Sequence, residues 1–128
     1  MEQNDAVTLE QLTEAARNED WNFVDGHINS SHLTREQIDW ALSIGLVDED
    51  KNIRDLAATL LDRSDEPLKP EEVEKLERIM AEDSYHIVRY RIAIALYKRG
   101  NRNLAVKQMM SEAKDDPDVG ELASSYLV

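Results

Sequence analysis

Few residues in this sequence have the types and spacing needed to hold a metal ion. The three histidines are His27, His32 and His86. His27 and His32 lie five positions apart, whereas two zinc ligands on one helical face need a spacing of four. The chain has no cysteine, which excludes thiolate ligands, disulfides and a cysteine nucleophile. We therefore predict that the protein has no metal site and needs no cofactor.

Carboxylates are abundant, but their pattern indicates helix capping rather than acid–base catalysis. Acidic pairs recur along the chain, and their second residues are spaced by 30, 33 and 33 positions: Asp20, Asp50, Asp83 and Asp116. An aspartate can accept hydrogen bonds from the free N–H groups of a first helical turn, and its charge suits the positive end of the helix dipole. The sequence also lacks a Gly-x-Ser-x-Gly motif and a phosphate-binding loop. We predict that the chain is not an enzyme.

A basic and aromatic segment is the best candidate for a binding surface. The chain has 27 acidic and 15 basic residues and a formal net charge of −12. Segment 84–111 contains no acidic residue but holds six of the basic ones, namely Arg89, Arg91, Lys98, Arg99, Arg102 and Lys107. When residues 85–99 are drawn as a helix, several of their side chains share one face. The candidate partner-binding residues are Tyr90, Arg91, Ile94, Tyr97 and Lys98, which Arg102 extends onto the next helix.

Two interpretations of this face remain open at the level of sequence. In the first, Tyr90, Ile94 and Tyr97 are core residues that contact helix 70–81, and the cations neutralise the acidic repeats beside them. In the second, the face lines the concave side of the molecule and binds a partner, because tyrosine and arginine are frequent hot spots of protein interfaces. The expected partner is then another protein with an acidic or mixed surface.

Helices that repeat about every thirty residues are the elements that must position these side chains. Apolar residues with helical spacing follow the acidic pairs, most clearly after Asp50 and Asp116. Thr8 and Thr34 each precede a glutamine by three positions, which is the spacing of a capping box. Pro70 suits a first helical turn. We expect helices at about 8–18, 20–29, 34–44, 50–63, 70–81, 84–99, 102–113 and 116–127, with Gly45 and Gly100 in left-handed conformations at helix ends.

Two segments resemble the second-helix signature of HEAT-type repeats, which is an Asp, then Val or Ile followed by Arg, then an Ala-Leu stripe. The segments are "DEDKNIRDLAATLL" and "EDSYHIVRYRIAIALYKRG". The resemblance is good over 47–113 and weak toward the N-terminus, and the last unit departs from it with Gly120 at the arginine position. It implies an all-α, right-handed α-α superhelix in a single domain, 1–128, with about four helical hairpins as its units: about 8–30, 34–63, 70–99 and 102–127.

The resemblance also implies roles for individual residues and for the whole chain. In HEAT-like proteins such Asp and Arg residues typically bond between neighbouring repeats, which implies structural roles for Asp50, Arg54, Asp83 and Arg89 beside the cap at Asp116. Such folds serve mostly as binding scaffolds, so we expect a non-enzymatic protein-interaction module. The alternatives are a nucleic-acid-binding protein that uses the same basic strip, and an accessory or lyase-type enzyme subunit of the family.

The overall charge and hydropathy limit where the chain can act. A net charge of −12 repels phosphate, which makes nucleic acid an unlikely ligand. The first residues lack the positive and apolar regions of a secretory signal, and no window reaches the 18 apolar residues of a membrane span. We therefore expect a cytoplasmic protein without membrane attachment.

Overall fold

Eight α-helices make up the part of the chain that the structure describes, residues 8–28 and 33–127, and no strand occurs there. The computed structural model contains α1 (Leu9–Arg17), α2 (Trp21–His27), α3 (Arg35–Ser43), α4 (Lys51–Arg63), α5 (Pro70–Glu82), α6 (His86–Lys98), α7 (Leu104–Ala113) and α8 (Gly120–Tyr126), with a short 3₁₀ helix, η2 (Gly45–Val47), before α4. The expected all-α class is confirmed. The expected end of the second helix at 29 and the residue His32 lie outside the described residues.

Side-chain caps explain where the first four helices, α1 to α4, begin. Thr8 and Thr34 form complete capping boxes with the glutamines three residues later, as their spacing predicts. The Asp20 and Asp50 side chains accept hydrogen bonds from the backbone N–H groups of the first turns of α2 and α4. Asp116 differs, because its carboxylate accepts from two N–H groups of the turn 116–119. For that reason α8 begins at Gly120, later than expected.

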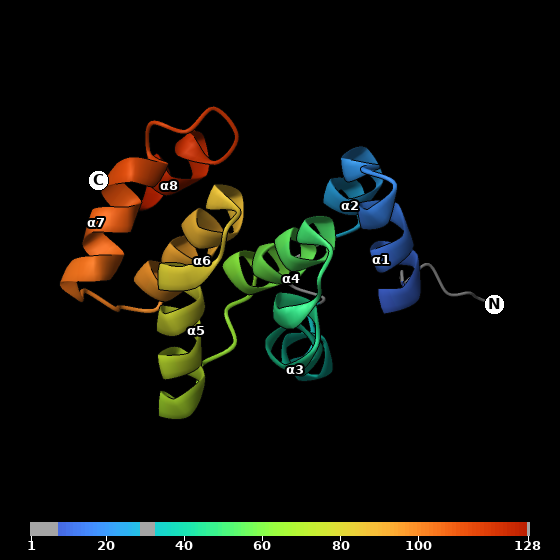
Figure 1. Cartoon of the computed structure of the whole chain (residues 1–128), viewed down its shortest axis with the longest axis horizontal. Coiled ribbons are helices and arrows are strands. Elements are labelled where there is room, and N and C mark those ends of the chain that lie inside the picture. The colour runs from blue at the N-terminus through green and yellow to red at the C-terminus, as the bar shows by residue number, and fades with distance from the viewer. Residues whose placement is uncertain (1–7, 29–32, 128) are drawn as a thin grey trace.

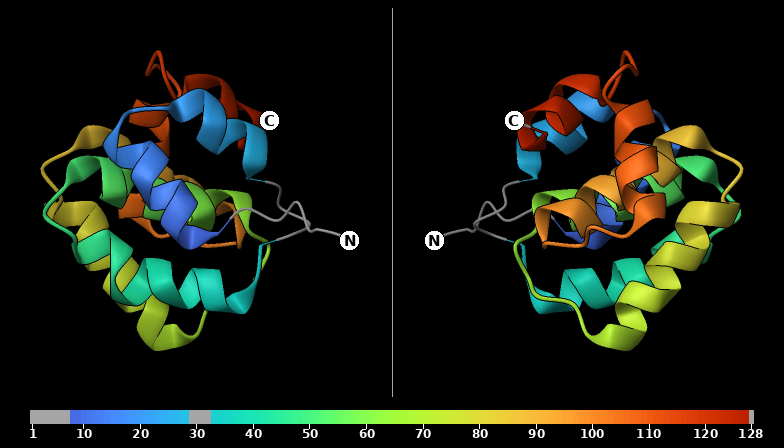
Figure 2. Two further views of the ribbon diagram at one scale, coloured as in Figure 1. Left: turned by 90° about the vertical axis from the view of Figure 1, so that its right-hand side faces the viewer. Right: turned by 90° about the vertical axis from the view of Figure 1, so that its left-hand side faces the viewer.

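The helices follow one another along the long axis of the molecule, from α1 and α2 at one end to α7 and α8 at the other (Figure 1). The central pair, α4 and α6, pack against each other, with α3 packed on α4 and α5 packed on α6. Viewed along the long axis, α2 and α8 lie on one side of this central pair, while α3 and α5 lie on the opposite side (Figure 2). The central pair therefore separates the side of the molecule that carries α2 and α8 from the side that carries α3 and α5.

Both central helices are buried over most of their circumference. In α4 the run from Leu56 to Leu61 is buried, and in α6 the run from Ile92 to Leu96 is buried. Burial of large aliphatic side chains provides about 1.5–3 kcal/mol each relative to exposure. These two runs are therefore the core to which the outer helices attach.

Two glycines are required for different reasons. Gly100 has a φ of 95° at the end of α6, so its predicted left-handed conformation is confirmed. The same prediction for Gly45 is wrong, because its φ is not positive. A Cβ atom at Gly45 would lie 2.6 Å from the Cβ of Ala57 and 2.9 Å from the ring of Trp40. Gly45 therefore allows η2 to approach α3 and α4 closely.

Substitution of Gly45 with alanine tests this explanation. We expect Gly45→Ala to lower the free energy of unfolding by about 1–3 kcal/mol, because the new methyl group overpacks a rigid contact. The matched control is Gly26→Ala within α2, where an added Cβ would meet nothing within 4 Å. That change should raise stability by about 0.5–1 kcal/mol, because glycine is unfavourable inside a helix. Urea denaturation of both variants gives the comparison, and the reverse order would contradict the packing role of Gly45.

Candidate functional site

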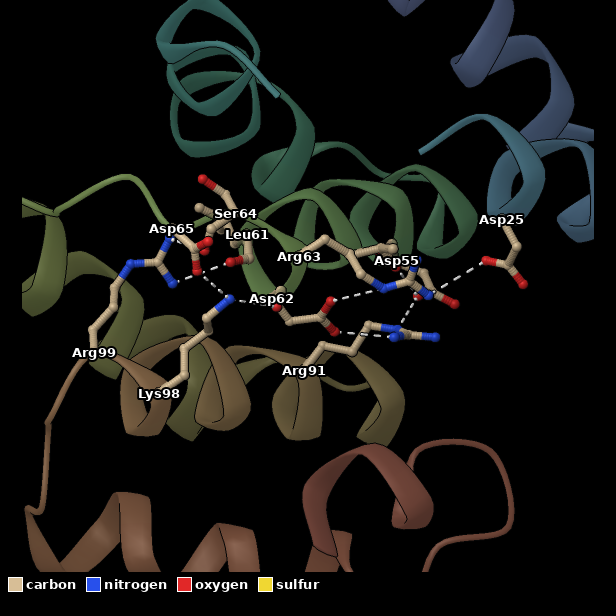
Figure 3. A network of polar contacts seen from close by, with 11 residues as sticks. Asp25, Asp55, Leu61, Asp62, Arg63, Ser64, Asp65, Arg91, Lys98 and Arg99 are labelled. Carbon is tan, nitrogen blue, oxygen red and sulfur yellow. Dashed lines mark hydrogen bonds and ion pairs between the residues drawn. The ribbon is translucent and has the colours of Figure 1, made fainter. Parts of the chain in front are cut away.

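A row of ion pairs lies along the contact between α4 and α6, seen from close by in Figure 3. At its centre, Arg91 Nε is 2.8 Å from Asp55 Oδ1, and Arg91 Nη1 is 3.0 Å from Asp62 Oδ2. The two aspartates are seven positions apart, so two helical turns bring them to the same face of α4. The Arg91 side chain is only 16% exposed. A single arginine of α6 therefore bridges two carboxylates of α4.

Two further cations of α6 continue this row toward the end of α4. Lys98 Nζ is 3.1 Å from Asp65 Oδ1 and 3.3 Å from the carbonyl oxygen of Asp62. The Arg99 guanidinium donates to carbonyl oxygens in and after the last turn of α4, those of Leu61, Ser64 and Glu66. Carbonyls at a helix end lack intrahelical partners, so Arg99 supplies the donors that they need. The cations of segment 84–111 that face α4 are therefore held inside the fold.

The expected exposed basic-aromatic face is not present as a continuous surface. Ile94 is fully buried, which corrects its assignment to a partner-binding face and places it in the core. Tyr90 and Tyr97 are half-buried and pack against that core. The physical reason is that α6 has neighbours on several sides, since α4, α5, α7 and α8 all pack against it. Arg102 is exposed, and its guanidinium carbon lies 3.5 Å from the centre of the Tyr97 ring.

A second set of contacts joins the beginning of α4 to the junction of α5 and α6. Arg54 Nε lies 2.9 Å from Asp83 Oδ2, and Arg54 Nη1 donates to the carbonyl oxygens of Asp48 and Glu49. Arg89 Nη1 donates to the carbonyl oxygen of Asp83 at 2.7 Å. Of the four residues to which the HEAT resemblance assigns such bonds, Arg54 and Asp83 join α4 to the α5–α6 junction. Arg89 bonds within that junction, and Asp50 caps α4.

Asp62 is the most unusual group of the row. Its side chain is completely buried, and burial raises its pKa to about 6 although the nearby Arg91 opposes the shift. Burial likewise raises the pKa of Asp55, again against the effect of Arg91. Asp62 Oδ1 has no hydrogen-bond partner among the described residues, and Arg63 Nε lies 3.7 Å from it, which is too long for a hydrogen bond. One oxygen of this buried carboxylate therefore accepts no hydrogen bond from the described residues.

A cavity of about 450 Å³ lies beside Asp62, and its lining comes from helices far apart in the sequence. The polar lining consists of Asp62, Arg63, Asp65 and Lys98. The apolar lining consists of Ile28 after α2, with Leu122 and Tyr126 from α8. We call this cavity the α2–α8 groove, because α2 and α8 lie on the same side of the central pair (Figure 2).

The histidines do not come together. His27 Nδ1 is 2.8 Å from the carbonyl oxygen of Phe23 within α2, and His86 Nε2 is 3.4 Å from Asp116 Oδ2. In residues 8–28 and 33–127, no three His, Asp or Glu side chains are grouped so that they could hold a metal ion. In the same residues no helix is long and apolar enough to cross a membrane.

Sequence reasoning missed Asp55 and Asp62, the two residues on which the row depends. Both are acidic residues inside the apolar stripe "RDLAATLLDR", and their separation of seven positions marks one helical face. Charged residues are almost never fully buried unless they are paired. Their position in a core stripe was therefore a usable signal for a partner such as Arg91.

The bond between hairpins can be tested at Arg54. We expect Arg54→Ala to lower the free energy of unfolding by about 1–3 kcal/mol, because it removes charge-assisted bonds to a largely buried carboxylate. The control is Arg78→Ala on the exposed face of α5, where a change within about 0.5 kcal/mol is expected. Thermal and urea unfolding measure both. Equal stability of the two variants would contradict a stabilising bond between Arg54 and Asp83.

Reversal of two of the cations that face α4 should destabilise the protein strongly. Arg91→Glu with Lys98→Glu places new carboxylates against Asp55, Asp62 and Asp65. We expect a loss of about 3–5 kcal/mol, because breaking a buried pair leaves an uncompensated charge. Arg102→Glu with Lys107→Glu makes the same change in net charge at exposed positions and should cost about 0–2 kcal/mol. A comparable loss in both variants would show that general charge balance, rather than the row, sets stability.

The raised pKa of Asp62 predicts a specific dependence of stability on pH. The unfolded-state pKa is 3.8 and the folded-state pKa is about 6, so the folded protein binds the proton more tightly. This group therefore makes the fold less stable as the pH rises from about 4 to 6, by about 3 kcal/mol in total. We expect Asp62→Asn to lose that decrease. Urea denaturation at several pH values measures it, and parallel pH profiles of wild type and variant would refute the assignment.

Comparison with known proteins adds no relative to this description. No family model, no curated protein and no solved structure matches the chain. The function must therefore be argued from the geometry of the α2–α8 groove and from the charges around it.

Proposed function

We propose that this chain is a non-enzymatic protein-interaction module that holds a partner protein in the α2–α8 groove. The proposal takes the helical hairpins α1–α2, α3–α4, α5–α6 and α7–α8 as four HEAT-like units of a right-handed superhelix in one domain. Two findings support it: the hairpins succeed one another along the long axis (Figure 1), and Arg54 bonds to Asp83 between successive units.

The observation that carries the proposal is the composition of the α2–α8 groove. Its volume of about 450 Å³ lies in the range of ligand-binding pockets, roughly 300–1,000 Å³. Its polar lining comes from Arg63, Asp65 and Lys98 and from Asp62, whose side chain has no exposed surface. Leu122 and Tyr126 add an apolar wall. Apolar contact area next to a few fixed polar groups is the arrangement that gives both affinity and orientation at a protein interface.

The charges around the groove favour a basic partner over the acidic or mixed one expected from sequence. Arg91 and Lys98 already face Asp55, Asp62 and Asp65, so their charges are offset within the fold. The net charge of −12 then attracts a basic surface and accelerates its association. The same argument weighs against nucleic acid as the ligand. Phosphate groups bind to available cations, whereas Arg91 and Lys98 are already paired with aspartates.

Titration of the ¹⁵N-labelled full chain with three probes at physiological salt tests this function. The probes are a peptide of alternating arginine and glycine, a peptide of alternating glutamate and glycine, and a single-stranded oligonucleotide. We expect only the basic peptide to shift amide resonances of the groove, those of Lys98, Leu122 and Tyr126. Shifts caused by the acidic peptide or the oligonucleotide would contradict the proposal. Shifts confined to the pocket between α1 and α2, which Glu14 and Asp20 line, would contradict it as well.

A further inference from the structure

The sides of α5 and α7 that face each other form a second groove. Both helices pack against α6 (Figure 1), and a cavity of about 310 Å³ lies between them. Its apolar lining consists of the exposed Ala81 and Ala105 and the half-buried Met109, and the buried Met80 completes it. The small alanine side chains leave the space between the two helices open. We call this cavity the α5–α7 groove.

The α5–α7 groove continues along α5. Glu77 and Asn103 also line a larger cavity of about 890 Å³, which reaches back along α5 to Pro70. The length of α5 from Pro70 to Ala81 is about 17 Å, or three helical turns. Leu104, which begins α7, is 76% exposed, the highest value for a large hydrophobic side chain in residues 8–28 and 33–127. An elongated surface with exposed apolar side chains suits a partner helix of about three turns.

Two carboxylates give the α5–α7 groove its charge. Glu77 and Glu112 line it beside the amides of Asn103 and Gln108, and no lysine or arginine belongs to the lining. Glu77 accepts hydrogen bonds from the side-chain amides of Asn101 and Asn103, which hold the carboxylate in place and leave its negative charge. Glu112 is exposed. A partner that lies between α5 and α7 therefore meets two negative charges.

The larger cavity carries both signs of charge, and its cations are already engaged. Lys98 pairs with Asp65, and Arg99 donates to backbone carbonyl oxygens. The Arg102 guanidinium lies over the ring of Tyr97. Selection of a partner by charge therefore takes place where α7 forms the wall of the groove.

The form of the α5–α7 groove favours a helix as its occupant. An extended peptide gains affinity by pairing with a sheet edge, and residues 8–28 and 33–127 contain no strand. A proline-rich segment docks between aromatic side chains, and the lining of this groove contains none. A helix satisfies its own backbone hydrogen bonds and lays one apolar face into a groove. The flexible side chain of Met109 can adapt to such a face.

We propose that the α5–α7 groove binds an amphipathic helix of a partner protein, with lysine or arginine side chains of that helix beside Glu77 and Glu112. The apolar face of the partner helix contacts Ala81, Ala105 and Met109. Complementary charge across the contact selects a basic helix over an acidic one. This inference goes beyond the proposed function, because it assigns a second surface that shares no lining residue with the α2–α8 groove.

Three peptides of about 18 residues test the inference on the ¹⁵N-labelled full chain at pH 7 and physiological salt. The first is an amphipathic helix of leucine, alanine and lysine with its leucines on one face. The second has glutamate in place of each lysine. The third has the composition of the first, in an order that spreads the leucines around the helix. We expect the first peptide to bind at least about tenfold more tightly than the other two, with the largest shifts at Ala81, Ala105 and Met109.

A pair of variants with the same change in charge tests the two carboxylates. Glu77→Gln with Glu112→Gln keeps a side-chain oxygen for the neighbouring amides and removes both charges. It should weaken binding of the lysine peptide at least about fivefold. Glu36→Gln with Glu71→Gln removes the same charge at exposed positions outside the groove. This control should change the affinity less than about twofold, because salt screens distant charges.

A second pair of variants tests the apolar part of the groove. Ala105→Arg places a large cationic side chain in the groove and should abolish the shifts. Ser111→Arg adds the same side chain at an exposed position of α7 outside the lining and should preserve them. Circular dichroism and thermal unfolding check that all variants are folded. If a groove variant does not fold, the comparison of the three peptides on wild type decides the question.

The outcomes separate this inference from the proposed function. Equal binding of the lysine and glutamate helices overturns the inference, and so does a preference for lysine that survives Glu77→Gln with Glu112→Gln. Shifts confined to the α2–α8 groove overturn it and leave the proposed function intact. A dimer in sedimentation equilibrium that buries Ala105 and Met109 would assign the groove to a second copy of this chain and overturn it as well. If no peptide moves a resonance of the α5–α7 groove, the inference is wrong, whatever the arginine-glycine peptide does.

Discussion

The bridge from Arg91 to Asp55 and Asp62 is the interaction on which the arrangement of the two central helices depends. Burial of charged groups costs several kcal/mol per ion, so an arginine and two aspartates are stable there only together. The guanidinium must lie between carboxylates that are two turns apart on α4. A slip of α6 along α4 by one turn, about 5.4 Å, would leave a buried carboxylate alone. The apolar contacts of Leu60 or Ile94 tolerate such a slip better, so the ion pairs fix the register.

This bridge also explains why a basic segment stands within an acidic chain. Carboxylates of α4 and of the loop after it pair with Arg91 and Lys98, and Arg99 donates to backbone carbonyls in and just after the last turn of α4. The charges that look like an isolated patch in the sequence are therefore complementary charges across one helix contact. As a consequence, the outer surface keeps the negative field of the chain, and the groove beside the bridge is suited to a cation.

Sequence reasoning reached the features that are set by local interactions. The capping boxes at Thr8 and Thr34 and the left-handed Gly100 depend only on residues a few positions away, and they were predicted correctly. Gly45 could not be interpreted in this way, because its small size is required by Trp40 and Ala57 from other helices. A helical wheel places Ile94 and Arg91 on one face. It could not show that α4, α5, α7 and α8 cover α6 on several sides.

The α2–α8 groove and the helix contact share one residue, Asp62. Oδ2 of Asp62 holds α6 through Arg91, whereas Oδ1 has no partner and lies in a residue that lines the groove. Arg91 offsets only part of the cost of burying this charge, so the pKa of Asp62 stays raised. A ligand that binds only the folded state also stabilises it. A partner bound in the groove would therefore stabilise the fold, including the α4–α6 contact that Asp62 joins.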